Sequence, residues 1–463
     1  MNIIFEYTTD KDISIFDNPN SMEDIRDYGA KVDGVTNDTQ AVRKAKNAAG
    51  PGGTIYFPRG TTIVDSKDRS GGACLRFVDN DTAGISVVGD GPGKSIVKVE
   101  GGHQDNIKGI RYFDDHDHDG AVIRDLTLDG NWSEQTPKDG DWGNGFGIEI
   151  RGGKQAVTIE NCVVQNWITN GGLMGAAGIR VRNCTFRNNG WGVHQEGRRG
   201  HGFNVNTSGS SGRVVAENCL FESNVGQAVD NNGGKMTIRN CVFDDHEFGI
   251  KMDADTEDIL LENVHIIGSD RTAIPIKCIP TGNESTGTLR LRSVIIENAR
   301  WPAIDLPQRP GPVSGDNILI KNVDTDDRRD GGFYIRSDRN VDIGTLSIHN
   351  VSGSALHFEG AGGRIDELVY SGVAGVGDTA GVDIGTARKG EPISVSVPSK
   401  SEVGAVLSSR SSEGDSPTRE YGVYSQPQAG TLNWHEPLND NFQTISDDVK
   451  DLARRLDELE SRL

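Results

Sequence analysis

The sequence predicts an all-β fold, a parallel β-helix, from three observations. An Asn, often followed by Cys, recurs in the phrases "IENCVV", "VRNCTF", "AENCLF" and "IRNCVF", at spacings of 22 to 35 residues. The residues before each Asn alternate between apolar and polar, which is typical of a strand with one buried face. Glycine is abundant, at 60 of 463 residues, and no repeat unit carries a helical apolar stripe. Such a repeat indicates a solenoid whose coils pair with their neighbours.

The repeated Asn predicts a ladder at a turn between strands. Equivalent residues of successive coils stack above one another, so that each amide can bond to the next. The Cys after four of these Asn residues is small and apolar enough to face inward, and we expect it to serve packing. The Asn column comprises Asn161, Asn183, Asn218, Asn240, Asn263, Ser293, Asn322 and Asn350, and the Cys column comprises Cys162, Cys184, Cys219 and Cys241.

A second short strand is expected about ten residues after each Asn. Its apolar residue points inward, as Val193, Val229, Ile250, Ile274, Ile304, Phe333 and Leu356. The following residues point outward and form a column of His194, Asp230, Lys251, Pro275, Asp305, Tyr334 and His357. Two positions further on, a second outer column holds Glu196, Asn232, Asp253, Lys277, Pro307, Arg336 and Glu359. A polar strip of this kind suits an extended oligosaccharide.

The catalytic candidates are Asp230, Asp253 and Lys251, in the part of this strip that is densest in ionisable groups. Two carboxylates about one coil apart can serve as acid and base in glycoside hydrolysis, or in lyase and epimerase chemistry. His194 and Glu196 lie beside them and are candidate ligand-binding residues, as is Asp305 further along. The alternative is an ordinary polar outer face.

Two loops add candidate ligand contacts. The longest repeat unit carries "QEGRRGHGFNVNTSGSSG", in which Arg198, Arg199 and His201 suit an acidic sugar. In the loop 129–145, Trp132 and Trp142 can stack on a sugar or pack onto the body of the protein. The stretch "DDHDHDG" at 114–120 matches no established metal-binding loop, so we expect a solvated turn, no metal and no cofactor.

The composition favours a soluble protein that does not bind nucleic acid. The net charge is −20, with 17 Lys against 31 Arg, which predicts a halophilic source, or alternatively an ordinary acidic surface. Phosphate contact needs clustered Lys and Arg. The N-terminus lacks a secretory signal pattern and no segment approaches a membrane span, so we expect synthesis in the cytoplasm and no membrane insertion.

Residues 27–64 resemble the N-terminal pattern of the pectate-lyase superfamily. They contain "DYGA", a "DG", an Asp-Thr pair before a short amphipathic helix, and then "GGTIYFPRG". The resemblance, which extends over about 25–370, implies a right-handed parallel β-helix whose open end is covered by that helix. Hydrolases, lyases, epimerases and viral tailspikes share the pattern. "RRGHGFNV" is similar to the Gly-His-Gly of polygalacturonases, but the paired Asp that precedes it in that family is absent, so that mechanism is not carried over.

The C-terminal end predicts a coiled coil. Apolar residues follow a 4-3 spacing to the end of the chain, at Leu438, Phe442, Ile445, Val449, Leu452, Leu456, Leu459 and Leu463. A single helix docked on the β-helix is the alternative. The predicted organisation is an arm (1–24), the β-helix (25–384), an irregular linker (385–432) and the coiled-coil segment (433–463).

These features favour a viral spike or fibre that binds a host cell-surface glycan, with or without cleaving or modifying it. Its predicted partners are the glycan, other virion proteins and further copies of itself, and its predicted location is the virion. The seam residues do not choose between a dimer and a trimer, and the resemblance to viral tailspikes implies a homotrimer. One alternative is a cellular polysaccharide lyase, hydrolase or epimerase in the cytoplasm. The other is a purely structural virion component. An enzyme would be a lyase or glycoside hydrolase acting on acidic glycan.

Overall fold

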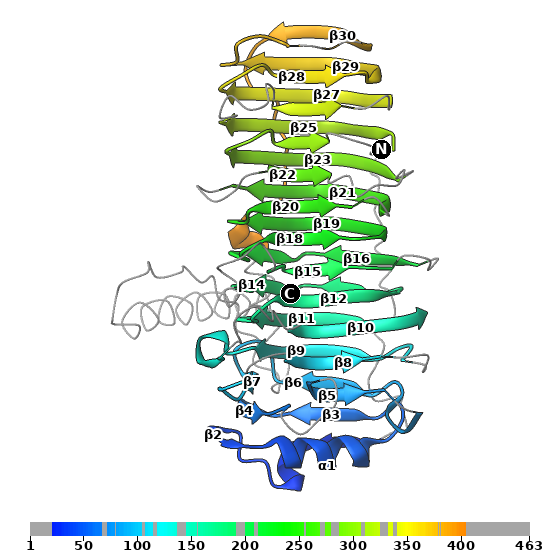
Figure 1. Cartoon of the computed structure of the whole chain (residues 1–463), viewed down its shortest axis with the longest axis vertical. Coiled ribbons are helices and arrows are strands. Elements are labelled where there is room, and N and C mark those ends of the chain that lie inside the picture. Colours follow the sequence, from blue (N-terminus) through cyan, green and yellow to red (C-terminus); the bar gives the residue numbers. More distant parts are fainter. Residues whose placement is uncertain are drawn as a thin grey trace, which may run out of the picture.

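The protein is a long stack of parallel β-coils, as a computed structural model shows (Figure 1). The structure describes residues 21–403, apart from the short segments 67–71, 79, 104–106, 114–117, 137–144, 155, 191–199, 208–211, 254–255, 269–273, 279–286, 307–310, 325–331, 337–339, 378 and 380. Every strand pairing within this part is parallel, which confirms the predicted parallel β-helix.

The coils contribute to two sheets. Sheet B has 11 strands: β5 (Ala73–Phe77), β8 (Lys108–Tyr112), β10 (Phe146–Lys154), β12 (Asn170–Ala177), β15 (Phe203–Val205), β18 (Gln227–Asn231), β20 (Phe248–Met252), β22 (Ile274–Cys278), β24 (Ile304–Leu306), β26 (Phe333–Arg336) and β28 (Leu356–Glu359). Along it, Val229, Ile250, Ile304, Phe333 and Leu356 point inward as predicted.

Sheet A has 19 strands and covers two sides of the stack. They are β1 (Met22–Asp24), β2 (Asp33–Asn37), β3 (Thr54–Phe57), β4 (Gly60–Val64), β6 (Ser86–Gly89), β7 (Ser95–Val99), β9 (Val122–Asp129), β11 (Thr158–Gln165), β13 (Arg180–Arg182), β14 (Thr185–Arg187), β16 (Arg213–Glu217), β17 (Leu220–Glu222), β19 (Gly234–Asp244), β21 (Thr256–Ile267), β23 (Thr288–Ala299), β25 (Val313–Val323), β27 (Asn340–Val351), β29 (Gly362–Ser371) and β30 (Val382–Lys389).

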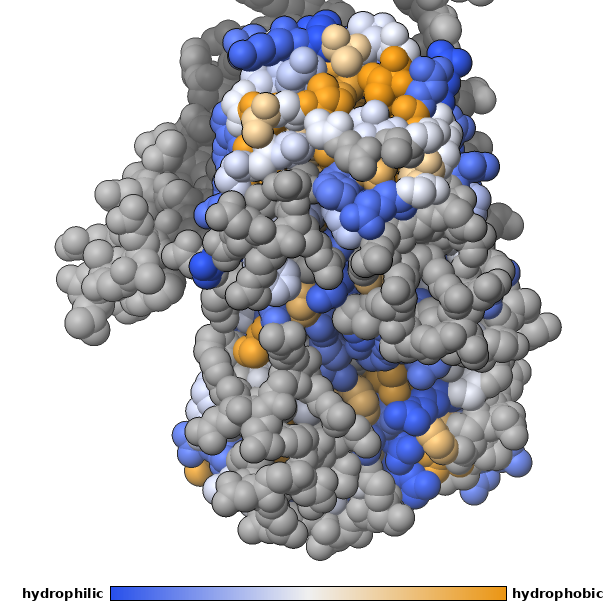
Figure 2. Space-filling view, turned by 45° about the horizontal axis from the view of Figure 1, so that its top comes forward, coloured by the Kyte–Doolittle hydropathy of each residue, from blue (hydrophilic) through white to orange (hydrophobic). Residues whose placement is uncertain are grey.

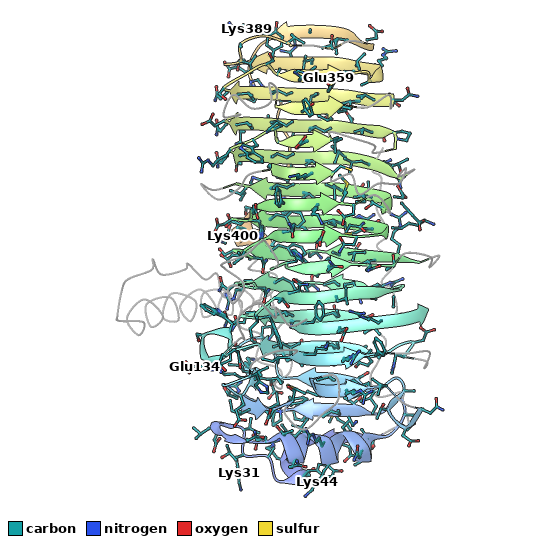
Figure 3. The ribbon with its side chains drawn as sticks, viewed as in Figure 1. Lys31, Lys44, Glu134, Glu359, Lys389 and Lys400 are labelled. Atoms are coloured by element: carbon teal, nitrogen blue, oxygen red, sulfur yellow. The ribbon has the colours of Figure 1, made fainter. Side chains whose placement is uncertain are left out.

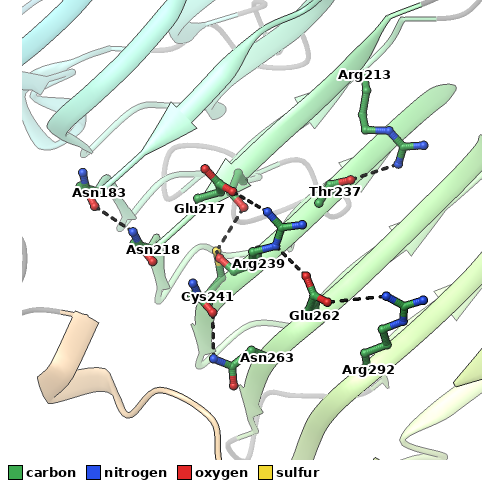
Figure 4. Close-up of polar contacts among 12 residues, drawn as sticks. Asn183, Arg213, Glu217, Asn218, Thr237, Arg239, Cys241, Glu262, Asn263 and Arg292 are labelled. Atoms are coloured by element: carbon green, nitrogen blue, oxygen red, sulfur yellow. Dashed lines mark hydrogen bonds and ion pairs between the residues drawn. The ribbon is translucent and has the colours of Figure 1, made fainter. Parts of the chain in front are cut away.

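The predicted Asn column is the bend between the two sides of sheet A. All eight of its residues, including Ser293, have a left-handed backbone with φ between 50° and 57°. Asn tolerates this conformation better than most residues, which explains the repeat. Amide bonds join neighbouring coils, from Asn218 to Asn183 at 3.2 Å and from Asn263 to Asn240 at 2.8 Å (Figure 4).

The Cys column faces the interior, as predicted. Cys162, Cys184, Cys219 and Cys241 are buried free thiols, and Cys241 Sγ donates to the carbonyl of Arg239 at 3.2 Å. Phenylalanines stack beside them in successive coils, with 4.8 Å between the ring centroids of Phe221 and Phe243. Like residues therefore lie on like residues through the core, which is the packing that a repeat demands.

Each long strand of sheet A that contains the Asn bend has one part before it and one part after it. The outer face of the part before the bend carries a ladder of ion pairs. Register places residues of alternating charge above one another, in the order Arg124, Glu160, Arg182, Glu217, Arg239, Glu262, Arg292 and Asp316. Arg239 lies 2.9 Å from Glu217 and 2.6 Å from Glu262 (Figure 4). We call this set the charge ladder.

The expected capping helix is α1 (Thr39–Ala49), which lies across the N-terminal end of the stack (Figure 1). Ala41, Val42, Ala45 and Ala49 are buried against the first coils and form the apolar face of α1. The carboxylate of Asp38 at the N-cap accepts from the backbone N–H groups of Lys31 and Val32, not from the helix. The described residues also include the short 3-10 helices η2 (Ile25–Tyr28), η3 (Asn80–Thr82) and η4 (Trp132–Glu134).

The last coil ends with β30, and 391–403 then run back along the outside of the stack (Figure 1). The predicted coiled-coil segment 433–463 and most of the arm 1–24 lie outside the described residues. Within the described part, the structure contains no helix that is long and apolar enough to cross a membrane.

Candidate functional site on the outer face of sheet B

The outer face of sheet B carries an irregular column of polar residues. Strand register stacks Asn204, Asp230, Lys251, Lys277, Asp305, Tyr334 and His357, one from each successive strand. We call this set the sheet-B column. Figure 2 shows hydrophilic side chains along the length of the visible face, with apolar ones near the end that comes forward.

Asp230 of this column has four polar partners. It accepts from Asn204 Nδ2 at 3.0 Å, from Asn232 Nδ2 at 3.2 Å and from Lys251 Nζ at 2.9 Å, and it lies 3.3 Å from His201 Nε2. A carboxylate has about four acceptor sites. These four partners fill them, so that Asp230 is buried and fixed.

Lys251 bridges Asp230 to a second carboxylate, Asp253. Its Nζ lies 2.9 Å from Asp230 Oδ1 and 3.1 Å from Asp253 Oδ1. Burial opposes the charged form, but the two carboxylates outweigh it and raise the pKa of Lys251. The side chain of Asp253 is 17 % exposed against 6 % for Asp230, so Asp253 is the carboxylate that a ligand can approach. The site therefore holds a fixed ammonium between two carboxylates.

The next two strands extend the site. Lys277 follows Lys251 in register, and its Nζ lies 4.6 Å from the centre of the Phe248 ring, a cation–π contact. Asp305 follows Lys277 and is fully buried. Burial, together with the charges of Asp253 and Asp305, raises the pKa of Cys278 to about 12. Cys278 is therefore not a reactive thiol.

A second charged group lies on the same face, nearer the N-terminus. Arg111, Glu149 and Leu173 precede Asn204 in register. Glu149 is buried and is paired with Arg111 Nε and Arg151 Nε, both at 2.8 Å. Arg111 also lies 4.1 Å from the centre of the Phe113 ring. This group was missed from the sequence because it precedes the Asn repeats, although "GFGIEIRGG" carries the alternation of a strand.

Of the predicted site residues, the structure brings His201, Asp230, Lys251 and Asp253 together. Asp305 lies further along the same column. Trp132 packs partly against the hydrophobic core, in line with the packing alternative. His194, Glu196, Arg198, Arg199 and Trp142 lie outside the described residues.

The predicted columns need two corrections. Lys277, not Pro275, follows Lys251, and Ile276, not Ile274, is in register with Ile250. In "IPIK" the two Ile residues are two positions apart, so their side chains lie on the same face of the strand. Alternation alone therefore cannot tell which Ile is in register with Ile250. The residue before Asp230 in the column is Asn204, from the loop sequence "GFNVN".

No group of three or more His, Cys, Asp or Glu side chains is arranged to hold a metal ion in the part of the chain that the structure describes.

Comparison with known proteins finds relatives among alginate-modifying enzymes of Azotobacter vinelandii. The chain is 29 % identical over 255 residues to mannuronan C5-epimerase AlgE5, which is 50 % of this chain and 24 % of that protein. It is 36 % identical over 110 residues to alginate lyase 7, which is 23 % of this chain and 12 % of that protein. These matches span a quarter or less of the length of the relatives.

Solved structures with a similar fold include enzymes and viral proteins. The A-module of mannuronan C-5 epimerase AlgE4 from Azotobacter vinelandii has a TM-score of 0.48 at 20 % identity, covering 81 % of this chain and 98 % of that one. The N-terminal fragment of bacteriophage phi29 gene product 12 has a TM-score of 0.48 at 14 % identity, covering 80 % and 73 %.

A family model described as "Rhamnogalacturonase A/epimerase, pectate lyase-like" matches residues 23–274, more than half of the chain. This match includes the first coils, the capping helix and the strands that carry Asp230 and Lys251. The chain therefore belongs to this pectate lyase-like family of carbohydrate-active β-helix proteins.

Proposed function

We propose that the protein modifies a uronic-acid polysaccharide along the outer face of sheet B, by removing the proton next to the sugar carboxylate. The reaction class is that of a C5-epimerase or a polysaccharide lyase. Family membership and the names of the relatives, mannuronan C5-epimerases and an alginate lyase, support the substrate class. This enzymatic function takes precedence over the spike favoured from the sequence.

The observation that carries the proposal is the position of Lys251. Its ammonium is fixed on the outer face, and its raised pKa keeps it charged at neutral pH. A fixed cation beside a sugar carboxylate offsets the negative charge that develops when the adjacent C–H bond is broken. Arg111 and Arg151 offer further cations along the same face. Arg111 lies five and Arg151 four strand spacings, of roughly 4.8 Å each, from Lys251.

In the proposed reaction, Asp253 takes the proton from C5 of the uronate. The electron pair left behind is delocalised into the carboxylate that Lys251 holds. In an epimerase, a proton from the solvent then adds to C5 from the opposite face. In a lyase, the bond from C4 to the glycosidic oxygen breaks, a C4–C5 double bond forms, and the leaving oxygen takes up a proton.

Asp230 and His201 act in this scheme as positioning residues. The four acceptor sites of Asp230 are filled, and one of its partners is His201. His201 Nδ1 in turn accepts from the backbone N–H of Gln227 at 3.4 Å. Glycoside hydrolysis needs a carboxyl group that can donate a proton to the leaving oxygen. Asp230 and Asp253 both face the Lys251 ammonium, which does not favour that role.

The test is to incubate the protein with polymannuronate, polyguluronate and polygalacturonate in deuterated water. Epimerisation places deuterium at C5 without shortening the chain, whereas elimination gives unsaturated ends that absorb ultraviolet light. We expect one of these products from the wild type and from Arg239→Gln, and none from Lys251→Met or Asp253→Asn. Saturated new reducing ends, or no product from any polymer with a folded wild type, would overturn the proposal.

The spike hypothesis remains a prediction from the sequence. Its main support, the apolar spacing from Leu438 to Leu463, falls outside the described residues. A homotrimer and attachment to a virion are therefore second proposals. Sedimentation of the full chain as a monomer at micromolar concentration would contradict both.

A further inference from the structure

The segment that follows the last strand is a strap along the outside of sheet A. Gly390 N–H donates to the carbonyl of Tyr370 on β29 at 3.1 Å, and Ile393 N–H donates to Ser347 Oγ on β27 at 3.3 Å. Lys400 then reaches Glu222 on β17 and Asp244 on β19. Figure 3 shows this path, with Lys389 at one end of the stack and Lys400 near its middle.

The strap crosses the strands in an extended conformation. Between β27 and the pair β17 and β19 lie four to five strand spacings, about 19–24 Å. The seven residues from Ile393 to Lys400 span about 23 Å when extended. Ile393, Val395 and Val397 are half-buried, whereas Ser394 and Ser396 are exposed. One face of the strap therefore lies on the sheet.

The strap runs over a largely apolar column on the outer face of sheet A. Its apolar members Leu220, Val242, Ile295, Leu319 and Val369 are all buried, and His265 and Ser347 stand between them in register. Val403, at the end of the strap, packs on Leu220 and Val242. An apolar column of this kind would be exposed without a covering segment, so the contact is built into the fold.

A helix start fixes the end of the strap. Ser399 and Glu402 form reciprocal hydrogen bonds, with 2.6 Å from Ser399 N to Glu402 Oε2 and 3.2 Å from Glu402 N to Ser399 Oγ. This arrangement is a capping box. Lys400 and Val403 are three residues apart and share a helix face, which lies against β17 and β19.

Lys400 neutralises a like-charge contact. Glu222 and Asp244 are register partners on adjacent strands, where like charges repel. The Nζ of Lys400 pairs with both, at 2.7 Å from Asp244 Oδ2. The other neighbours in register are Arg187, which hydrogen-bonds to Gln165 Oε1, and Ile267. Lys400 is therefore the cation between these two carboxylates.

The same two coils carry the candidate site. A short turn leads from Glu222 to β18, which carries Asp230, and another leads from Asp244 to β20, which carries Lys251. A buried hydrogen bond joins these two turns, from the backbone N–H of Asn224 to His246 Nδ1 at 3.2 Å. Asn189 Nδ2, in the turn of the preceding coil, donates to Asn224 Oδ1 at 2.8 Å. The spacing of β17 and β19 is thus passed on to β18 and β20.

We propose that Lys400 is a positioning residue for the site, although it lies on a different face. By holding Glu222 and Asp244 together it fixes the spacing of the two coils, and through their turns the spacing of Asp230 and Lys251. The effect on the ligand rests on the proposed function, whereas the effect on the site strands does not.

The test compares Lys400→Met with Lys400→Arg and with Lys321→Met in the full chain. Lys321 is a matched control, because it also pairs with a carboxylate on sheet A, Glu297 at 2.7 Å, and its side chain has the same 36 % exposure as Lys400. Amide hydrogen exchange is followed in 227–231 and 248–252, and binding of mannuronate oligomers is measured by calorimetry.

We expect Lys400→Met to speed exchange in both site strands about fivefold, through like-charge repulsion between their coils. It should also weaken oligomer binding several-fold, Lys400→Arg should restore both properties, and Lys321→Met should change neither. The inference would be overturned if amide exchange in Lys400→Met equalled that in Lys321→Met. It would also be overturned if the wild type bound the oligomer and Lys400→Met bound it equally well. If the wild type binds no oligomer, the proposed function fails, and exchange alone then decides the role of Lys400.

Discussion

Two columns of charged residues run along the same coils on different faces, and they obey different rules. In the charge ladder, Arg and acidic residues alternate without exception over eight strands, and their side chains are partly exposed. In the sheet-B column the alternation fails, because Lys251 stands next to Lys277. There the carboxylates of Asp230 and Asp305 are buried.

The difference separates stabilisation from function. An alternating ladder places each charge beside opposite charges and favours one register, since a slip of one coil would bring like charges together. The sheet-B column instead holds two buried carboxylates, Asp230 and Asp305, and one of them shares the Lys251 ammonium with the neighbouring Asp253. Buried charged groups that do not follow the pattern of the repeat are typical of a functional site.

The largest effect is expected from Lys251→Met. It leaves Asp230 and Asp253 without their shared cation, and breaking a buried ion pair costs about 3 kcal/mol of unfolding free energy. The matched change in the ladder, Arg239→Met, removes two partly exposed ion pairs, to Glu217 and Glu262, and should cost about 1 kcal/mol or less. Urea unfolding of both variants and of the wild type measures these two losses.

Equal losses from these two variants would remove the distinction between the columns. Retention of polymer modification by Lys251→Met would also show that the ammonium is not part of the site.

A smaller effect is expected from reversing one charge of the ladder. Arg239→Glu would place an acidic residue between Glu217 and Glu262, turning two attractions into two repulsions. We expect a loss of about 1–2 kcal/mol with unchanged activity. Thermal melts together with the polymer assay check this, and reduced activity in a folded variant would link the ladder to the site.

The fold was largely predictable because the repeat imposes it. Asn161 and its equivalents mark a left-handed bend that few residues tolerate, and Cys162 and its equivalents mark the adjoining core position. The alternation of apolar and polar residues around these positions predicts the strands. The strap over Leu220 and Val242 was not predictable, since "ISVSV" shows a strand pattern but no partner.

The site was predictable in its composition and less so in its geometry. The outward orientation of Asp230, Lys251 and Asp253 follows from the apolar–polar alternation of their strands. Asn204 and Lys277 were missed as members of the column, because register between coils of unequal length depends on turns that alternation does not describe. The saturated hydrogen bonding of Asp230 depends on His201 and Asn232, which only the folded coils bring together.

The smallest expected difference between the two columns is their response to salt. With a net charge of −20, the whole chain should gain stability as salt screens its self-repulsion, and it should lose structure near 0.05 M. Across the salt range in which the chain is folded, the cost of Arg239→Met should shrink by a few tenths of a kcal/mol toward molar KCl, because the ladder is exposed to screening. The cost of Lys251→Met should stay nearly constant, since that pair is buried.

Unfolding curves of the wild type, Arg239→Met and Lys251→Met across KCl concentrations measure both trends. A wild type equally stable at 0.05 M would argue against a halophilic origin, and parallel salt dependence of the two variants would show that the sheet-B column is as open to solvent as the ladder.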